Sequence, residues 1–288
     1  MMEKLFKAGG VMDNEKEIPK VIHYCWFGGN PLPESAVRCI ESWKKYCPGY
    51  EIREWNESNY DVNACVYIQE AYRAKKWAFV SDYARFDILY SYGGLYFDTD
   101  VELIRPIHDI LQAGPFMGRE RNVLGKESYM VNPGLGIGAA AGMPIYKEIL
   151  DSYTQMHFIN PDGTYNQATV VHYTTKLLEK HGLTNSTEPK CVEDIWIYPW
   201  EYFCPMDYVT GDLSVSDNTY SIHHYSATWL NKEEILEKQV VEKIAKRFNG
   251  RIAVLCGRVY SFPFRVRKKI QQKGFRGTLR FVFKKLFR

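Results

Sequence analysis

The chain has 288 residues, 45% hydrophobic and 15% aromatic, which is enough for one sizeable core. Seven scattered cysteines without C-x-x-C spacing argue against a disulfide framework and a structural zinc site, and favour reduced thiols in a cytosol. The sequence has no apolar run of the roughly 20 residues that span a bilayer, and its polar start leads us to expect no signal peptide.

The net charge of +3 is unevenly distributed along the chain. Residues 265–288 contain ten basic residues and no acidic ones, so the rest of the chain carries about −7. Aromatic and aliphatic residues are mixed with these bases, a composition suited to an anionic membrane surface. Disorder and nucleic-acid binding are the alternatives, but nothing else in the chain resembles a nucleic-acid-binding module. We expect residues 262–288 to bind an anionic membrane and expect no nucleic-acid partner.

The sequence predicts three parts: a polar lead-in at 1–17, a central domain at 18–250 and a basic amphipathic tail at 251–288. The first part of the central domain alternates strands and helices with short links. We expect strands over 18–25 and 50–55, and helices over 33–46 and 64–75. This alternation predicts an α/β fold with a mostly parallel central sheet flanked by helices.

Residues 77–92 predict the next helix, because Phe79, Tyr83, Phe86 and Tyr90 recur at the spacing of one helical face. Glycine suits the left-handed conformation that often ends a helix, and Gly93-Gly94 stands at that point.

The apolar run Leu95–Phe97 predicts a short buried strand, and Asp98-Thr99-Asp100 follows it directly. In open α/β sheets, ligands bind beyond the carboxyl ends of the strands. Two carboxylates one residue apart can reach a hard divalent cation that also holds phosphate oxygens. The sequence therefore predicts a cation site at this end of the sheet.

The second half of the chain contains further apolar strands and amphipathic helices. We expect strands over 101–104, 116–120, 132–139 and 195–203, and helices over 144–158, 167–181 and 231–248. Residues 132–139 are rich in glycine, but a phosphate-binding loop is disfavoured there because G-K-[ST] is missing.

The pattern from Ser81 to Asp100 (SDYARFDILYSYGGLYFDTD) resembles glycosyltransferase family 32. That family contains yeast-type mannosyltransferases and bacterial capsule and lipopolysaccharide enzymes, and it is related to the clostridial glucosylating toxins. Two other segments also resemble it: residues 18–28 (IPKVIHYCWFG) and 220–229 (YSIHHYSATW). The second segment has Thr228 where the family usually has serine, which keeps a hydroxyl. The resemblance implies a GT-A type nucleotide-sugar-binding fold.

The same resemblance implies a metal site for Mn²⁺ or Mg²⁺. Asp100 and Asp98 would be ligands, with His223 as the third. Adjacent residues on a strand point to opposite faces, so only one of His223 and His224 can reach the metal. Which of the two does so is left open by the sequence.

The resemblance also implies catalytic and donor-binding residues. Asp82 and Arg85, on one helix face, would contact donor hydroxyls and phosphates; an internal salt bridge is the alternative. Trp26 would stack on the base or belong to the core, and Tyr83 would contact the donor or belong to the core. The catalytic set is Asp82, Arg85, Asp98 and Asp100. The donor-binding set is Trp26, Phe27, Gly28, Ser81, Asp82, Tyr83, Arg85, Gly94, Tyr96, Asp98, Thr228 and Trp229.

The function implied by the resemblance is a retaining, metal-dependent transfer of a sugar from a nucleotide diphosphate, with no nucleophile identified. We expect a UDP-sugar as the donor, with GDP-mannose as the alternative. The acceptor would be a glycan or lipid-linked oligosaccharide of a bacterial capsule or lipopolysaccharide, made at the inner face of the cytoplasmic membrane. The alternatives are a toxin-like effector that glycosylates a host protein and a non-catalytic sugar- or membrane-binding protein.

Overall fold

The computed structural model of the chain describes residues 17–121, 130–166, 168–226 and 232–245, and four single residues beyond them. The chain divides into two compact units. The larger comprises Met1–Asn122, Lys126–Met206 and Leu213–Ser226, and the smaller comprises Val123–Gly125, Asp207–Asp212 and Ala227–Arg288. The predicted boundary at 250/251 and nearly all of the predicted tail lie outside the described residues, so the proposed division into parts stays a prediction.

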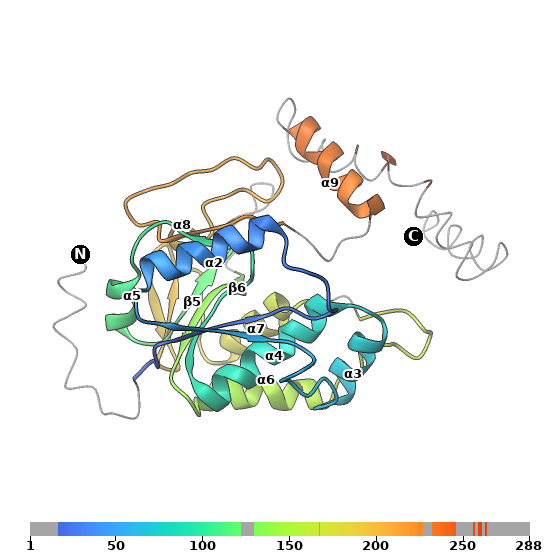
Figure 1. Cartoon of the computed structure of the whole chain (residues 1–288), viewed down its shortest axis with the longest axis horizontal. Coiled ribbons are helices and arrows are strands. Elements are labelled where there is room, and N and C mark those ends of the chain that lie inside the picture. Colours follow the sequence, from blue (N-terminus) through green and yellow to red (C-terminus); the bar gives the residue numbers. More distant parts are fainter. Residues whose placement is uncertain are drawn as a thin grey trace. The chain divides into compact units, whose positions relative to one another are not determined.

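A sheet of seven described strands forms the centre of the larger unit, in the order β2-β1-β3-β6-β5-β8-β7 (Figure 1). Its strands are β1 Val21–Cys25, β2 Glu51–Trp55, β3 Gly94–Tyr96, β5 Phe116–Arg119, β6 Val131–Ala139, β7 Lys190–Val192 and β8 Ile195–Tyr198. Only β6 and β7 run against the other five strands. The expected α/β class and mostly parallel sheet are confirmed.

Helices cover both faces of this sheet, with α4, α6 and α7 on one face and α2 on the other (Figure 1). The helices of the larger unit are α2 Glu34–Tyr46, α3 Val66–Arg73, α4 Trp77–Tyr92, α5 His108–Ala113, α6 Pro144–Thr154, α7 Val170–Lys180 and α8 Trp200–Phe203. Alternate strand residues enter opposite layers, as the pleat requires. Leu95 packs with the α2 layer, whereas Tyr96 packs with the α4 layer.

A second sheet of two strands pairs β4 (Val101–Leu103) with β9 (Ser221–His223) in antiparallel register. This pairing joins segments that are more than a hundred residues apart in the sequence. The Trp43 indole of α2 donates a hydrogen bond to the carbonyl oxygen of Val101 at 2.7 Å and so attaches β4 to the main layer.

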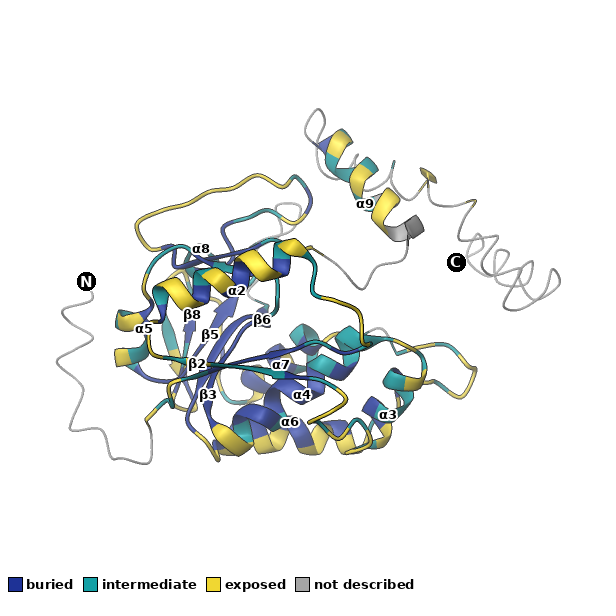
Figure 2. Cartoon of the chain, in the orientation of Figure 1, coloured by how far each residue is buried: buried dark blue, intermediate teal, exposed yellow. Residues whose placement is uncertain are grey.

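Helix α4 is buried on more than the single face that its apolar spacing predicts (Figure 2). Tyr83 and Phe86 are buried as expected, but Phe79 and Tyr90 are only partly buried. The polar residues Asp82 and Arg85 are buried as well. The reason is the position of α4 between β1 and the helices α3 and α6, which contact it from several sides.

The predicted strand over 195–203 is wrong in its second half. β8 ends at Tyr198, and the short helix α8 follows Pro199, which stands at its N-cap position with φ −57°. Proline cannot donate to a strand ladder but suits the start of a helix. The aromatic composition of the segment concealed this break.

His23, in the middle of β1, links three parts of the sheet. Its Nδ1 accepts a hydrogen bond from the Trp55 indole at 3.0 Å, and its Nε2 donates to the Gly93 carbonyl oxygen at 3.0 Å. Burial lowers the pKa of His23 to about 4, so the ring is neutral at pH 7. Gly94 follows with φ +100°, and a Cβ there would lie 2.7 Å from the Val21 carbonyl oxygen. The hydrogen bond from His23 to Gly93 and the backbone conformation of Gly94 together fix the turn from α4 into β3.

The described part of the smaller unit consists of 207–212, helix α9 (Lys232–Ala245) and four single residues. Val209 and Ala245 are buried in a small apolar cluster with Val241 and Ile244. The Lys238 ammonium lies 5.5 Å from the centre of the Tyr208 ring. Among the described helices of both units, none is long and apolar enough to cross a membrane.

Candidate active site

Three side chains from two distant segments meet at the carboxyl end of β3. Asp98 follows β3, Asp100 precedes β4, and His223 ends β9 directly opposite Val101. Each of the three offers one ligand atom, and these atoms lie within 4.8 Å of one another. The β4–β9 pairing therefore brings the distant histidine to the acidic pair.

Asp100 is held as a carboxylate by its neighbours. Its Oδ1 lies 3.2 Å from His223 Nε2, and its Oδ2 accepts the Ser226 N–H at 2.8 Å. Burial alone would raise the pKa of Asp100, but His223 and the Ser226 N–H hold it at about 2. Burial alone would lower the pKa of His223, but the charge of Asp100 outweighs it and raises that pKa.

His224 points away from this cluster, as expected for the neighbour of a strand residue. Its Nε2 lies 2.7 Å from Glu102 Oε2, while its backbone N–H donates to the Asp100 carbonyl oxygen at 2.9 Å. His223 is therefore the member of the pair whose ring faces the two aspartates.

The donor set suits a divalent cation in its chemistry. Two carboxylates and one imidazole form an oxygen-rich site of the kind that Mn²⁺ accepts, and carboxylates are also ligands for Mg²⁺. Among the described residues, Nδ1 of His223 is buried without a hydrogen-bond partner. These side chains thus fit the metal site that the sequence predicted.

Arg85, on α4, joins two carboxylates. Its guanidinium lies 3.1 Å from Asp82 Oδ1 and 3.3 Å from Asp98 Oδ1, and only 4% of its side chain is exposed. It also lies over the Tyr96 ring, 4.9 Å from the ring centre. The salt bridge considered from the sequence is present, and it extends to the first aspartate of the acidic pair.

One guanidinium shared by two carboxylates does not cancel the effect of burial on their two pKa values. Burial raises the pKa of Asp82 to about 6 although Arg85 opposes this, and the charge of Asp98 adds to the rise. Burial likewise raises the pKa of Asp98 against the effect of Arg85. Burial would lower the pKa of Arg85, but Asp98 and Asp82 hold it above its usual range, so the guanidinium stays charged.

Asp98 is also positioned by Tyr96, which was predicted to bind the donor, and by Gly134, which the sequence did not single out. Its N–H donates to the Gly134 carbonyl oxygen at 3.3 Å, and the Tyr96 hydroxyl donates to its Oδ1 at 3.2 Å. A Cβ on Gly134 would lie 2.2 Å from Asp98 Oδ2. The glycine-rich composition of 132–139 was the available signal, but it did not identify this contact.

The loop after β1 contains three of the predicted donor-binding residues. Trp26 is partly buried, and its indole donates to the Asn30 carbonyl oxygen at 2.6 Å. Phe27 is buried against Tyr60, with ring centres 5.9 Å apart. The Gly28 N–H donates to a Glu57 carboxylate oxygen at 2.6 Å. Burial gives Phe27 a packing role, and its contact with a donor stays a prediction.

Those of the other predicted donor-binding residues that the structure describes also have structural partners. The Ser81 hydroxyl donates to the Trp77 carbonyl oxygen at 3.2 Å, and Tyr83 packs edge-on against Tyr153. Gly94 forms the turn described above. Thr228 and Trp229 lie outside the described residues, so their roles stay predictions.

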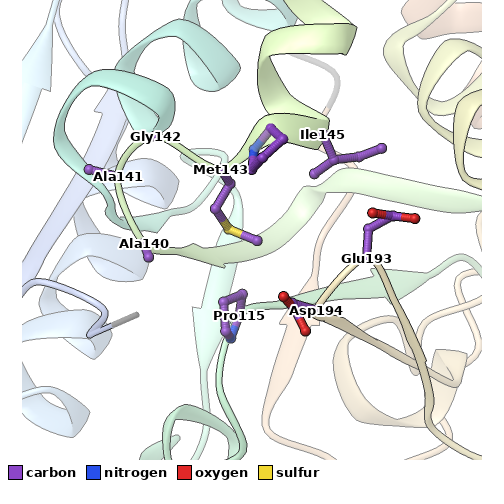
Figure 3. A pocket seen from close by; sticks show the side chains of 9 residues that line it. Pro115, Ala140, Ala141, Gly142, Met143, Ile145, Glu193 and Asp194 are labelled. Atoms are coloured by element: carbon purple, nitrogen blue, oxygen red, sulfur yellow. The ribbon is translucent and has the colours of Figure 1, made fainter. Parts of the chain in front are cut away.

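A pocket of about 510 Å³ lies beyond the C-terminal end of β6, and Figure 3 shows the side chains that line it. It is lined by Pro115, Ala140, Ala141, Gly142, Met143, Pro144, Ile145, Glu193 and Asp194. Ala140 follows the end of β6 that pairs with the start of β3, whereas Asp98 follows the end of β3. This pocket is therefore separate from the acidic cluster.

Comparison with known families matches residues 33–117 to "Glycosyltransferase sugar-binding region containing DXD motif". Inositol phosphoceramide mannosyltransferase 1 of Schizosaccharomyces pombe is 29% identical over 113 residues, covering 35% of this chain and 34% of the relative. Subversion of eukaryotic traffic protein A of Legionella pneumophila is 26% identical over 141 residues, covering 40% of this chain and 21% of the relative. The chain thus spans about a third of the length of the first relative and about a fifth of the second.

Two solved structures show a partial likeness to the chain. The PaToxG glycosyltransferase has a TM-score of 0.42 at 16% identity, covering 57% of this chain and 70% of its own. The galactosyltransferase LgtC has a TM-score of 0.41 at 11% identity, covering 78% of this chain and 95% of its own. The fold class stated above rests on the strand order of the sheet. Residues 33–117 thus match a glycosyltransferase sugar-binding region with a DXD motif, which supports the resemblance that Ser81 to Asp100 predicted.

Proposed function

We propose that this chain is a metal-dependent, retaining glycosyltransferase that takes a sugar from a nucleotide diphosphate. The observation that carries this proposal is the convergence of Asp98, Asp100 and His223 beside the buried Asp82–Arg85 pair. A non-catalytic sugar-binding protein would not need so many ionisable side chains gathered at a largely buried site, because burying charged groups costs free energy.

The residues of the cluster have distinct tasks in this proposal. Asp98, Asp100 and His223 hold Mn²⁺ or Mg²⁺, and the ion, when bound, stabilises the negative charge of the nucleotide diphosphate leaving group. Arg85 keeps Asp98 oriented and presents a fixed positive charge to donor oxygens. Asp82 accepts hydrogen bonds from sugar hydroxyls, and its low-dielectric surroundings strengthen those bonds.

The donor in our proposal is a UDP-sugar, with GDP-mannose as the second candidate. Two relatives from Schizosaccharomyces pombe are named mannosyltransferases, which supports the second candidate. Hydrolysis of a panel of UDP- and GDP-sugars, with and without Mn²⁺, tests both. Turnover that requires Mn²⁺ supports the proposal, whereas no turnover of any donor would support a binding protein.

Retention of configuration is tested separately, by NMR of the product formed with the preferred donor. The expected product has the anomeric configuration of the donor sugar. A product with the opposite anomer would exclude a retaining mechanism.

The acceptor in our proposal is a glycan or lipid-linked oligosaccharide of a bacterial surface polysaccharide, capsule or lipopolysaccharide. The enzyme would act at the cytoplasmic face of the membrane, bound through residues 262–288. The ten bases among aromatic residues in this segment support the idea. We expect the full chain to bind anionic vesicles, and a chain lacking 262–288 to bind them weakly. Equal binding by both chains would contradict membrane attachment through this segment.

A second candidate function is the glycosylation of a host protein. It is favoured by one observation, the similarity to the Legionella protein named for the subversion of eukaryotic traffic. Transfer of radiolabelled sugar to proteins of a eukaryotic lysate, rather than to a lipid extract from bacteria, would favour this function over polysaccharide synthesis.

A further inference from the structure

The middle of β6 departs from regular pairing with β5. Phe116 and Met117 pair with Gly138 and Ile137, but the next residue, Gly118, pairs with Asn132. Residues 133–136 therefore have no partner on β5 and form a bulge. Bulges re-aim side chains and are frequent beside active sites.

The side chain of Asn132 forms hydrogen bonds with both sides of this bulge. Its Oδ1 accepts the Gly134 N–H at 2.7 Å, and its Nδ2 donates to Glu120 Oε1 at 2.8 Å. Glu120 lies just beyond β5, and its N–H donates to the Met130 carbonyl oxygen at 2.8 Å. Asn132 is buried and Glu120 partly buried, so water competes little for the bond between them.

The bulge lies directly against the first aspartate of the site. The pairing of β3 with β6 ends at Tyr96 and Ile137, so Asp98 lies beyond it. There its N–H donates to the Gly134 carbonyl oxygen at 3.3 Å, and the space beside its carboxylate is limited by Gly134 Cα. The position of Gly134 therefore determines where the Asp98 backbone and carboxylate lie.

We propose that Glu120 and Asn132 form a positioning pair that holds Gly134 against Asp98 and so orients the first carboxylate of the site. Neither residue needs to touch substrate for this role. The catalytic consequence rests on the proposed glycosyltransferase function, but the positioning itself does not. A loosened Asp98 would bind the cation less tightly, because ligands held by surrounding hydrogen bonds bind metals best.

Amide hydrogen exchange tests the positioning without metal or donor. In Asn132→Ala, we expect the amides of Gly134 and Asp98 to exchange about tenfold faster, as expected when a hydrogen bond that protects them is lost. Glu120→Ala should show a smaller increase, because the bond from Asn132 to Gly134 remains. Glu120→Gln should restore protection, because its side-chain oxygen still accepts from Asn132.

The matched control is Asn218→Ala. Asn218 donates to Glu201 Oε1 at 3.0 Å at the exposed surface, so the same type of bond is removed away from the site. We expect the exchange of Gly134 and Asp98 to be unchanged in this variant. Unchanged exchange in both Asn132→Ala and Glu120→Ala would overturn the proposal, and Glu120→Ala keeps the test decisive if Asn132→Ala does not fold.

Mn²⁺ binding, followed by electron paramagnetic resonance, provides the second measurement. We expect weaker binding, by about tenfold or more, in Asn132→Ala and Glu120→Ala, with recovery in Glu120→Gln. Full-strength binding in both alanine variants would contradict the effect on the metal site. If the wild-type chain neither binds Mn²⁺ nor hydrolyses a nucleotide sugar, the proposed function fails, and hydrogen exchange still decides the positioning role.

Discussion

Asp98 and Asp100 are only two positions apart, but their surroundings shift the pKa of each in opposite directions. Asp100 faces His223 and a backbone N–H, which hold its pKa at about 2. Asp98 shares Arg85 with Asp82, and burial raises its pKa. The number of partners per carboxylate, and not burial alone, therefore sets the charge state. The half of the site formed by Asp100 and His223 is charged without a ligand. In the other half, Asp82 and Asp98 together have more negative charge than the single guanidinium of Arg85 offsets.

The largest expected effect comes from removing that guanidinium. Arg85→Met leaves the buried Asp82 and the partly buried Asp98 without a cation, and breaking a buried ion pair such as Asp82–Arg85 in this way costs about 3–5 kcal/mol. Urea unfolding at pH 7 measures the loss. The control is Arg38→Ala, which removes the exposed pair with Glu34 and should cost less than about 1 kcal/mol. Similar losses in both variants would show that Arg85 is not the cation on which this half depends.

The next effect concerns the other half of the site. Asp100→Asn keeps the shape but removes the charge that faces His223. We expect kcat/KM with Mn²⁺ to fall by about 10²–10³, the range seen when one group that stabilises charge in the transition state is lost.

The matched control for this variant is Glu102→Gln, two residues further along. It removes the carboxylate that His224 contacts outside the cluster, and it should leave kcat/KM nearly unchanged. If Asp100→Asn and Glu102→Gln have equal activity, Asp100 has no special role.

The pH dependence of stability distinguishes Asp82, in the site, from His23, in the surrounding sheet. The folded state raises the pKa of Asp82 from 3.8 to about 6, so the stability that the protonated acid supplies is lost as the pH rises through 6. The folded state lowers the pKa of His23 from 6.5 to about 4, so its contribution is present above 6.5 and is lost as the pH falls through 4. Each shift corresponds to about 3 kcal/mol, and the two slopes oppose each other between pH 4 and 6.

Two variants resolve these opposing slopes. In Asp82→Asn, the free energy of unfolding should rise with pH between 4 and 6 more steeply than in the wild type. His23→Gln removes the imidazole that contacts Gly93 and Trp55 but leaves the charged neighbours Arg53 and Glu51 in place. In this variant, the free energy of unfolding should fall with pH over the same range. Parallel curves for the two variants and the wild type would contradict both shifts.

The smallest expected effect concerns the space around Asp98. Gly134→Ala places a methyl group 2.2 Å from Asp98 Oδ2, so the carboxylate must move. We expect Mn²⁺ affinity to fall by about tenfold, as for other losses of support around a metal ligand. The control is Gly138→Ala, which lies at the other end of β6 and whose methyl group would meet the Phe116 ring. Comparable losses of Mn²⁺ affinity in both variants would indicate general strain and not displacement of Asp98.

The main features of the site could be predicted because they depend on local patterns. The acidic pair follows an apolar strand, and its helix and glycine turn have clear sequence signals, so the location beyond β3 was predictable. His223 could be added through the resemblance of 220–229 to a family motif. The structural reason for its position is the β4–β9 pairing, which no local pattern reveals.

The features that escaped prediction depend on tertiary packing. The burial of Asp82 and Arg85 results from α4 having neighbours on several sides, whereas helical periodicity predicts only one buried face. The bulge of β6 and the bond between Glu120 and Asn132 join two strands through side chains 12 residues apart. Spacing within one strand carries no information about such a partner.

Crystals grown with Mn²⁺ and UDP would show, through the anomalous scattering of manganese, whether Asp98, Asp100 and His223 form the cation site of a nucleotide-sugar transferase. We predict one strong anomalous peak in contact with Asp100 and His223, with the diphosphate of UDP beside it. A structure with UDP bound elsewhere, or with no manganese at these three residues, would show that they are not the cation site of such an enzyme.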